Sequence, residues 1–198
     1  MFYIINITMR ILSFDVGLRN LASCLVELDP AAALPFPADG FPGSAMERVR
    51  VVDWRVVDAM SGAGRRPDVD EVCDGVYARL DELLEAHGMP DVVLIENQPC
   101  MRNPVMKSVQ VMIYSYYRML TRTSGVAIRV AFVNATLKLA GTAAARGASY
   151  KDRKAASVAS VAAWLPPGGA KKRDDLADCL LQALQWLRRG SLSSLSLL

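Results

Sequence analysis

The chain has 198 residues, 52% of them hydrophobic and 22% charged, which is enough apolar material to bury a sizeable core within one domain. No run of about 18 residues is both apolar and uncharged, and residues 1–8 lack the basic start and the small-residue cleavage site of a signal peptide. These features argue against membrane-spanning and secreted proteins, and they predict an intracellular protein with no membrane partner.

Cysteine spacing favours a reducing compartment and argues against a metal–thiolate site. The cysteines fit no C-x-x-C or Cys/His spacing, and the one histidine, His87, precedes Gly88, a residue type that often ends helices. We therefore expect reduced core thiols and a histidine at a helix end, not a zinc site or a Cys/His nucleophile. The four cysteines are Cys24, Cys73, Cys100 and Cys179.

The formal net charge of +3 conceals a strong asymmetry along the chain. Residues 101–173 contain thirteen Lys or Arg and one acid, Asp152, so their net charge is +12, whereas residues 1–100 have a net charge of −8. Such a basic segment is typical of proteins that bind a polyanion. A solvated basic surface on an ordinary domain is the alternative.

Hydrophobic periodicity and turn residues predict an α/β chain with five strands and four helices. Gly17 and Asn20 predict a tight turn that makes the first two strands a hairpin, and the Pro-, Ala- and Gly-rich stretch 29–47 predicts a loop before the third strand. The predicted elements are strands 10–15, 21–28 and 48–57, helix 69–87, strand 91–96, helix 104–123, strand 126–133, and helices 149–164 and 173–189.

Four carboxylates stand where a strand or a helix would hold them rigidly. Asp15 ends the first predicted strand and Glu96 ends the fourth, while Asp175 and Asp178 lie on the last predicted helix. Their three-residue spacing puts Asp175 and Asp178 on one helical face, with Gln182 next in line. The opposite face is predicted to turn toward the core through Leu176, Leu180, Leu184 and Leu187.

A cluster of carboxylates predicts a divalent metal, because the negative charges repel one another unless cations lie between them. Magnesium prefers such oxygen ligands, and a pair of ions about 4 Å apart can activate a water and stabilise the leaving oxygen of a phosphodiester. Each acid alone would more often be a turn residue or a helix-dipole partner. The four together, beside a basic segment, favour a nuclease with two Mg²⁺ per active site, for which Mn²⁺ would substitute.

Three motifs carry a resemblance to a known family. SFDVGLRNLA at 13–22 places an acid before a glycine, a basic residue and an Asn, LIENQP at 94–99 contains the second acid, and KKRDDLAD at 171–178 places basic residues before an Asp-x-x-Asp pair. Over about residues 10–188 the chain resembles the RuvC-like Holliday junction resolvases of the RNase H-like superfamily, especially those of poxviruses and other large DNA viruses.

This resemblance implies one RNase H-like nuclease domain over residues 1–198, with a flexible tail at 190–198. Its fold would be a five-stranded mixed sheet, three antiparallel strands followed by parallel strands, flanked by helices. The implied activity is paired, symmetric, metal-dependent nicking of four-way DNA junctions, with water as the nucleophile and no covalent intermediate. A poxviral member of the family would work in virus factories of the host cytoplasm.

The resemblance also implies which residues act. Asp15, Glu96, Asp175 and Asp178 would be the catalytic residues and the metal ligands. Asp174 leaves an ambiguity of one residue, and Asp175 is preferred because only it has an acidic partner three residues later.

The helix predicted at 104–123 combines a polar row with a broad apolar surface. The apolar residues cover more than one stripe, so this helix either serves both the core and a subunit interface or is simply deeply buried. Two symmetric cuts are most simply made by a two-fold homodimer with one active site per subunit. The polar row, which suits phosphate contacts, consists of Lys107, Gln110, Tyr114, Arg118 and Arg122.

The expected partner is four-way junction DNA, without any small-molecule substrate. Basic residues that flank the last two predicted helices would hold phosphates next to the cut, together with those of the polar row. The predicted DNA-binding residues are Lys107, Arg118, Arg122, Lys138, Lys151, Arg153, Lys154, Lys171, Lys172 and Arg173.

Other functions fit parts of the pattern. A D-x-G-x-x-N turn after a first strand also occurs in actin-like and sugar-kinase ATPases, but those proteins need two such domains, and this chain has no second glycine-rich phosphate loop. A junction-binding protein without catalysis would need only the basic segment. An RNase H-like nuclease acting on RNA:DNA hybrids or flaps would use the same acids.

Overall fold

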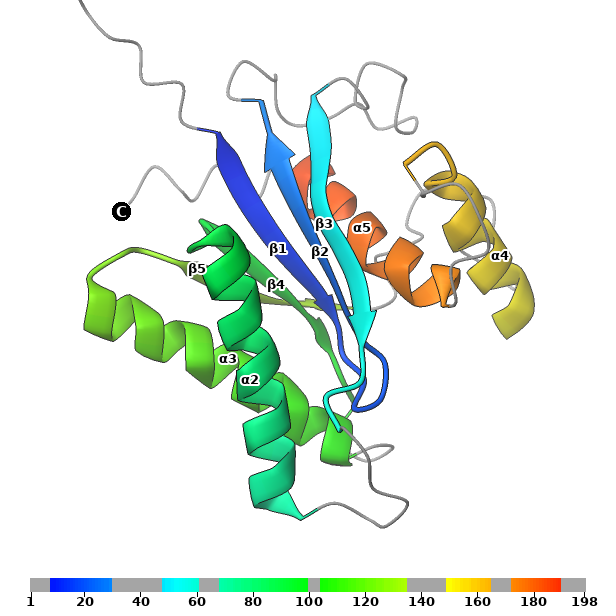
Figure 1. Cartoon of the computed structure of the whole chain (residues 1–198). Helices are drawn as coiled ribbons and strands as arrows, with labels where there is room; N and C mark the ends of the chain where they lie inside the picture. The colour runs from blue at the N-terminus through cyan, green and yellow to red at the C-terminus, as the bar shows by residue number, and fades with distance from the viewer. Residues whose placement is uncertain are drawn as a thin grey trace, which may run out of the picture.

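The computed structural model describes residues 8–29, 48–60, 68–99, 104–134, 149–164 and 172–189. Within these residues a five-stranded mixed sheet has the strand order β3-β2-β1-β4-β5 (Figure 1). The antiparallel part contains β1 (Met9–Asp15), β2 (Leu21–Leu28) and β3 (Val49–Val57). The parallel part adds β4 (Val92–Asn97) next to β1 and β5 (Arg129–Asn134) next to β4. The predicted five-stranded mixed sheet is confirmed. Most of the predicted loop, 30–47, and the tail 190–198 lie outside the described residues.

Helices cover both faces of this sheet, as Figure 1 shows. Helices α2 (Val69–His87) and α3 (Pro104–Ser124) lie on one face, and α5 (Arg173–Arg188) lies on the other. Helix α4 (Tyr150–Ser160) packs against α5. No described helix is long and apolar enough to cross a membrane.

Side chains of β1 and β4 alternate between two hydrophobic clusters, because successive strand residues point to opposite faces. Phe14 and Ile95 pack with α2 and α3, whereas Ile11 and Leu94 pack with α5. This alternation assigns a face to every residue of the two central strands.

Helix α2 has the ends that its sequence predicts. Asp68 accepts a hydrogen bond from the backbone N–H of Glu71, whose side chain in turn accepts from the N–H of Asp68, and Gly88 follows the helix with a φ of 72°. His87 lies in the last turn of the helix, as predicted. The predicted free core thiols are observed at Cys24 and Cys179, which are buried, whereas Cys73 is free but partly exposed and Cys100 lies outside the described residues.

Two predicted boundaries are wrong. The last strand begins at Arg129 instead of residue 126, because Gly125 adopts a φ of 73° and the N–H of Val126 bonds back to Ser124 Oγ at 3.1 Å, which extends the turn after α3. Helix α4 ends at Ser160 instead of residue 164. Beyond it the backbone bonds reach three residues back, as from Trp164 N to Val161 O at 3.0 Å, which is a tighter turn than an α-helix.

Helix α5 differs most from its prediction. A single core-facing leucine stripe was expected, but nearly every residue from Leu176 to Leu187 is buried. The cause is apolar residues around the whole circumference, which a helix can bury only when it lies between two layers. In the structure α5 lies between the sheet and α4 (Figure 1).

Candidate active site

Asp15 and Glu96 lie side by side at the carboxyl ends of β1 and β4. The two strands are parallel and Phe14 pairs with Ile95, so the next residue of each strand is one of the two acids. Neighbouring strands lie about 4.8 Å apart, and residues at paired positions share a face. Phe14 and Ile95 face α2 and α3, so Asp15 and Glu96 face α5. Both carboxyl residues are partly exposed.

Helix α5 runs antiparallel to β1 and brings its own acids to this end of the sheet. Near its carboxyl end Trp186 stacks with Arg129, the first residue of β5, at 5.5 Å. One turn earlier, Gln182 Nε2 donates to Ser13 Oγ at 3.1 Å and to the carbonyl oxygen of Phe14 at 3.2 Å. Asp178 and Asp175 lie four and seven residues before Gln182, on the same face and farther toward the end of β1.

The acidic face of α5 is therefore turned toward the sheet, not away from the core as the sequence analysis predicts. A second bond supports this placement, since Trp54 Nε1 of β3 donates to the carbonyl oxygen of Leu176 at 2.8 Å. Together these bonds tie α5 to β1 and to β3.

The electrostatics of the site couple Asp15 to Asp175. The pKa of Asp175 is raised by burial and by the negative charges of Asp174 and Asp15, with Lys154 and Lys172 opposing the rise. Carboxylates that disfavour one another's charge in this way are the arrangement that a divalent cation would stabilise.

Asp174 directly precedes Asp175 but has a different environment. Burial acts to raise its pKa, but a hydrogen bond from Lys154 Nζ, a backbone hydrogen bond and the positive charges of Lys154 and Lys172 together lower it. Lys154 Nζ lies 3.7 Å from Asp175 Oδ1, so one lysine touches both residues. The negative charge of Asp15 acts on the pKa of Asp175, which agrees with the choice of Asp175 made from sequence; that choice stays a prediction.

The end of β4 is tied to the start of α3 by amide side chains that sequence analysis did not identify as part of the site. Gln98 Nε2 donates to Glu96 Oε2 at 3.0 Å, and the N–H of Gln98 donates to Gln110 Oε1 at 2.8 Å. Lys107 Nζ donates to Asn97 Oδ1 at 3.1 Å and to Gln110 Oε1 at 3.2 Å. The one sequence signal for the bond from Gln98 to Glu96 is that Gln98 comes two residues after an acid at a strand end.

Gln110 is consequently wrong as a member of the predicted phosphate-binding row. It is fully buried, and its amide oxygen accepts bonds within the protein. The face of α3 that bears it packs against the end of β4, because the helix begins close to that strand. Tyr114 in the same row stacks on Phe132 of β5 with ring centroids 5.0 Å apart.

The predicted DNA-binding residues fall into three groups. Arg118 and Arg122 are exposed on α3, Lys151 is exposed on α4, and Lys172 is exposed before α5, where it adopts a left-handed backbone with φ 64°. A second group is partly buried: Lys107 and Lys154 lie near the acids, and Arg173 begins the helix that carries two of them. Outside the described part of the chain lie Lys138, Lys171 and the side chain of Arg153.

The donor set suits magnesium in its chemistry, since carboxylate oxygens are the ligands that this ion prefers. Among the described residues, no three His, Cys, Asp or Glu side chains lie close enough together to surround one ion as they are placed. The four acids are thus brought to one face and one end of the sheet without forming a closed coordination shell.

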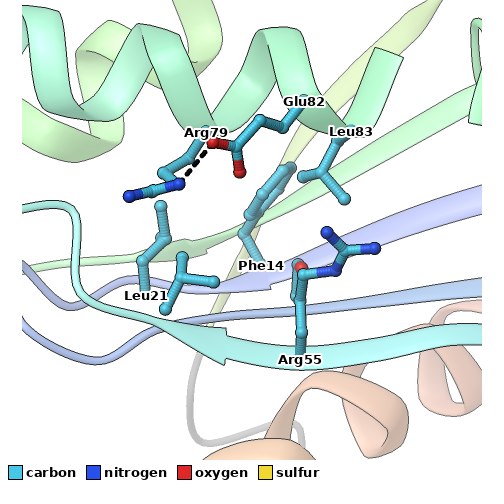
Figure 2. Close-up of a pocket in the computed structure, with 8 residues that line it drawn as sticks. Phe14, Leu21, Arg55, Arg79, Glu82 and Leu83 are labelled. Atoms are coloured by element: carbon cyan, nitrogen blue, oxygen red, sulfur yellow. Dashed lines mark hydrogen bonds and ion pairs between the residues drawn. The ribbon is translucent and has the colours of Figure 1, made fainter. Parts of the chain in front are cut away.

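A small cavity lies on the other face of the sheet, between β1–β3 and α2 (Figure 2). Phe14 points into it while the next residue, Asp15, faces α5, and Arg79 pairs with Glu82 along its rim. Its volume of about 10 Å³ is close to that of one water. This cavity is separated from the acids by the sheet and is not part of the candidate site.

Comparison with solved structures defines the class of fold. The yeast mitochondrial Holliday junction resolvase Ydc2 superposes with a TM-score of 0.61 at 16% identity, over 96% of this chain and 83% of that one. Thermus thermophilus RuvC and the fowlpox virus Holliday junction resolvase each give a TM-score of 0.56 at 18% identity, over 92% and 91% of this chain and 97% and 99% of theirs. The chain has the RuvC-like form of the RNase H-like fold.

The family follows from sequence. The family described as Poxvirus A22 protein matches residues 9–190, and the chain belongs to this family. None of the curated proteins matches the chain in sequence. The predicted resemblance to RuvC-like resolvases of the poxvirus type is thereby confirmed.

Proposed function

We propose that this protein is a magnesium-dependent endonuclease that resolves four-way DNA junctions by paired, symmetric nicks. The observation that carries the proposal is the meeting of β1, β4 and the acidic face of α5 at one end of the sheet. Membership of the Poxvirus A22 family supports it. So does the shared fold of proteins whose names identify them as Holliday junction resolvases, one of them described in complex with junction DNA.

The four acids would act as the metal ligands of this enzyme. When bound, Mg²⁺ would activate a water and stabilise the leaving oxygen of the phosphodiester. Gln98 would orient Glu96 through its hydrogen bond, and Lys154 would offset the negative charge around Asp174 and Asp175. The exposed arginines and lysines of α3 and α4 would hold phosphates on either side of the cut.

A homodimer is proposed because a four-way junction is cut at two symmetric positions, which a two-fold pair of active sites meets in equivalent geometry. The surface of α3 and β5 supports this, since large apolar side chains remain exposed there after α3 has packed on the sheet. Val111 is 48% exposed, Met119 60% and Phe132 45%. Apolar side chains of this size on neighbouring elements are typical of subunit contacts.

The proposal is tested with labelled four-way junctions, linear duplex, flaps and RNA:DNA hybrid, with and without Mg²⁺, using the natural protein and the Asp15→Asn variant. We expect paired nicks in the junction that require both the metal and Asp15. Faster cutting of hybrids or flaps would replace the proposal with a less selective nuclease. Tight junction binding without any cleavage in Mg²⁺ or Mn²⁺ would replace it with a binding protein.

The dimer is tested by mixing natural and Asp15→Asn subunits that carry different affinity tags. We expect purified heterodimers to nick one strand only, because each active site serves one strand. Two incisions by the heterodimer, or a monomer as the active species, would contradict the arrangement with one site per subunit.

A further inference from the structure

Gln182 is a fully buried amide that no part of the proposed chemistry uses. It lies in the middle of α5 with 0% exposure and contacts β1 directly before Asp15. Few polar side chains of the described residues are buried to this extent, and burying an amide is costly unless it is hydrogen-bonded. Gln182 belongs to the helix that carries Asp175 and Asp178, and it faces the strand that ends in Asp15. This position calls for an explanation.

The orientation of this amide follows from its partners. The backbone oxygen of Phe14 can only accept a hydrogen bond, so the side-chain atom 3.2 Å away must be the NH₂ group of Gln182. The same group donates to Ser13 Oγ. Gln182 Oε1 is buried too and has no partner among the residues that the structure describes. The two bonds of the NH₂ group are therefore what holds this side chain.

These bonds set the position of α5 along β1. From Gln182 to Asp178 the helix rises about 6 Å, and from Ser13 to Asp15 the strand advances about 7 Å in the same direction. A bond between Gln182 and Ser13 thus places Asp178 level with Asp15. A leucine at this position would fill the space but would allow the helix to slide or rotate, since apolar contacts are not directional.

We propose that Gln182 is a positioning residue that locks α5 to β1 and so sets the separation between Asp15 and the Asp175–Asp178 pair. This inference rests on the proposed function and extends it. Asp15 and Asp175 already influence each other's charge, so a displacement of about 1 Å at this contact would change the geometry in which the acids share a cation. Errors of that size cost enzymes up to about a hundredfold in rate.

The test compares Gln182→Met with Gln185→Met. Methionine preserves much of the length and volume of glutamine but has no N–H donor. Gln185 is 3% exposed and lies almost one turn farther along α5, away from the acids, so its variant removes an equally buried amide from the same helix. Ser13→Ala, which removes one of the two acceptors, is the milder second variant.

Three quantities are measured at a temperature where every variant is folded: Mn²⁺ affinity by calorimetric titration, junction affinity in EDTA, and kcat for junction cleavage. For Gln182→Met we expect Mn²⁺ affinity and kcat to fall by about tenfold or more while junction affinity stays within about twofold. Gln185→Met should match the natural protein in all three, and Ser13→Ala should lie between.

Other outcomes would overturn the inference. Equal Mn²⁺ affinity and kcat in the Gln182 and Gln185 variants would show that the amide does not position the acids. A parallel fall of all three quantities would show a merely structural role. If Gln182→Met does not fold, Ser13→Ala decides, and natural Mn²⁺ affinity and kcat in that variant would refute the proposal. Failure of the natural protein itself to bind Mn²⁺ and cleave junctions would instead refute the proposed function, and the inference with it.

Discussion

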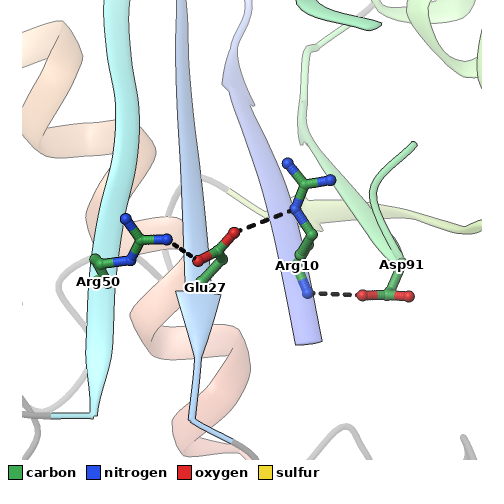
Figure 3. A network of polar contacts seen from close by, with 4 residues as sticks. All are labelled: Arg10, Glu27, Arg50 and Asp91. Atoms are coloured by element: carbon green, nitrogen blue, oxygen red, sulfur yellow. Dashed lines mark hydrogen bonds and ion pairs between the residues drawn. The ribbon is translucent and has the colours of Figure 1, made fainter. Parts of the chain in front are cut away.

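Charged side chains are arranged differently at the two ends of the central sheet. At the end where β1 begins, Glu27 of β2 pairs with Arg10 and Arg50 of the flanking strands, and Asp91 accepts a hydrogen bond from the N–H of Arg10 at 2.7 Å (Figure 3). Signs alternate across the strands there. At the end where β1 stops, several carboxylates lie near one lysine, Lys154, and the negative charge of Asp15 raises the pKa of Asp175.

This difference separates charge that stabilises the fold from charge that is positioned for chemistry. Opposite charges on neighbouring strands add modestly to stability, whereas clustered carboxylates cost stability unless a cation is bound. A protein retains such a cluster when the cation is part of its function. The comparison therefore supports, independently of the sequence motifs, the proposal that the active site lies at the end where β1 stops.

The largest expected effect is on cleavage, at the acidic end. Asp175→Asn should reduce the rate of junction cleavage about 1000-fold, since loss of a metal ligand removes several kcal/mol of transition-state stabilisation. Asp174→Asn should stay within about tenfold of the natural rate, because Asp174 bonds Lys154 and is not the partner of Asp15. Single-turnover cleavage of a labelled junction measures both. Equal losses of cleavage rate in the two variants would contradict the proposal that Asp175, and not Asp174, is a metal ligand.

Gly17→Ala should affect both the rate and the stability. A Cβ at Gly17 would lie 2.5 Å from the carbonyl oxygen of Asn20, so the turn that follows Asp15 would have to shift. We expect a loss of about 1–3 kcal/mol in the free energy of unfolding and a fall in kcat of about tenfold to a hundredfold. Urea unfolding and cleavage kinetics measure the two effects. Natural kcat in a destabilised variant would show that the turn does not position Asp15.

A smaller effect, on stability alone, is expected at the opposite end of the sheet. Glu27→Gln leaves Arg10 and Arg50 without their carboxylate and should lower the free energy of unfolding by about 1 kcal/mol, a modest value because Arg50 is largely exposed. The cleavage rate should not change. Thermal unfolding measures the change in stability and the junction assay measures the cleavage rate. A loss of cleavage would contradict a purely stabilising role for the charges at this end.

The smallest effect concerns DNA binding by exposed arginines. Arg118→Ala and Arg122→Ala should each weaken junction binding severalfold, equally for all junction sequences, and reduce the salt dependence of the binding constant by about one unit of slope. Arg50→Ala, which removes an exposed arginine from the other end of the sheet, is the matched control and should leave the slope unchanged. Binding isotherms at several salt concentrations measure these slopes.

Much of the fold could be predicted from the sequence because its signals are local. The helix predicted at 69–87, the glycine that ends it and the hairpin of the first two strands depend on neighbouring residues, and the structure confirms each. Two features were mispredicted. The start of β5 depends on how the turn at Gly125 closes, and the burial of α5 depends on its packing between two layers.

In the candidate site, too, some features could be predicted from local sequence and others could not. Local patterns identified Asp15, Glu96, Asp175 and Asp178, because an acid at a strand end or a pair on one helical turn is visible in sequence. The roles of Gln98, Gln110 and Gln182 were not visible, since an amide side chain becomes informative only through the distant groups that it bonds. The identity of the acids as metal ligands and the intracellular location stay predictions.

The order of strands and helices along the chain, the acids at their ends and the basic segment that follows them could be read from sequence, because propensity and charge are properties of short stretches of chain. Which face of α5 meets the sheet, and how far Asp178 lies along β1, became known from the folded chain. Those quantities depend on bonds between residues far apart in the chain, such as the one from Gln182 to Ser13, which no local pattern encodes.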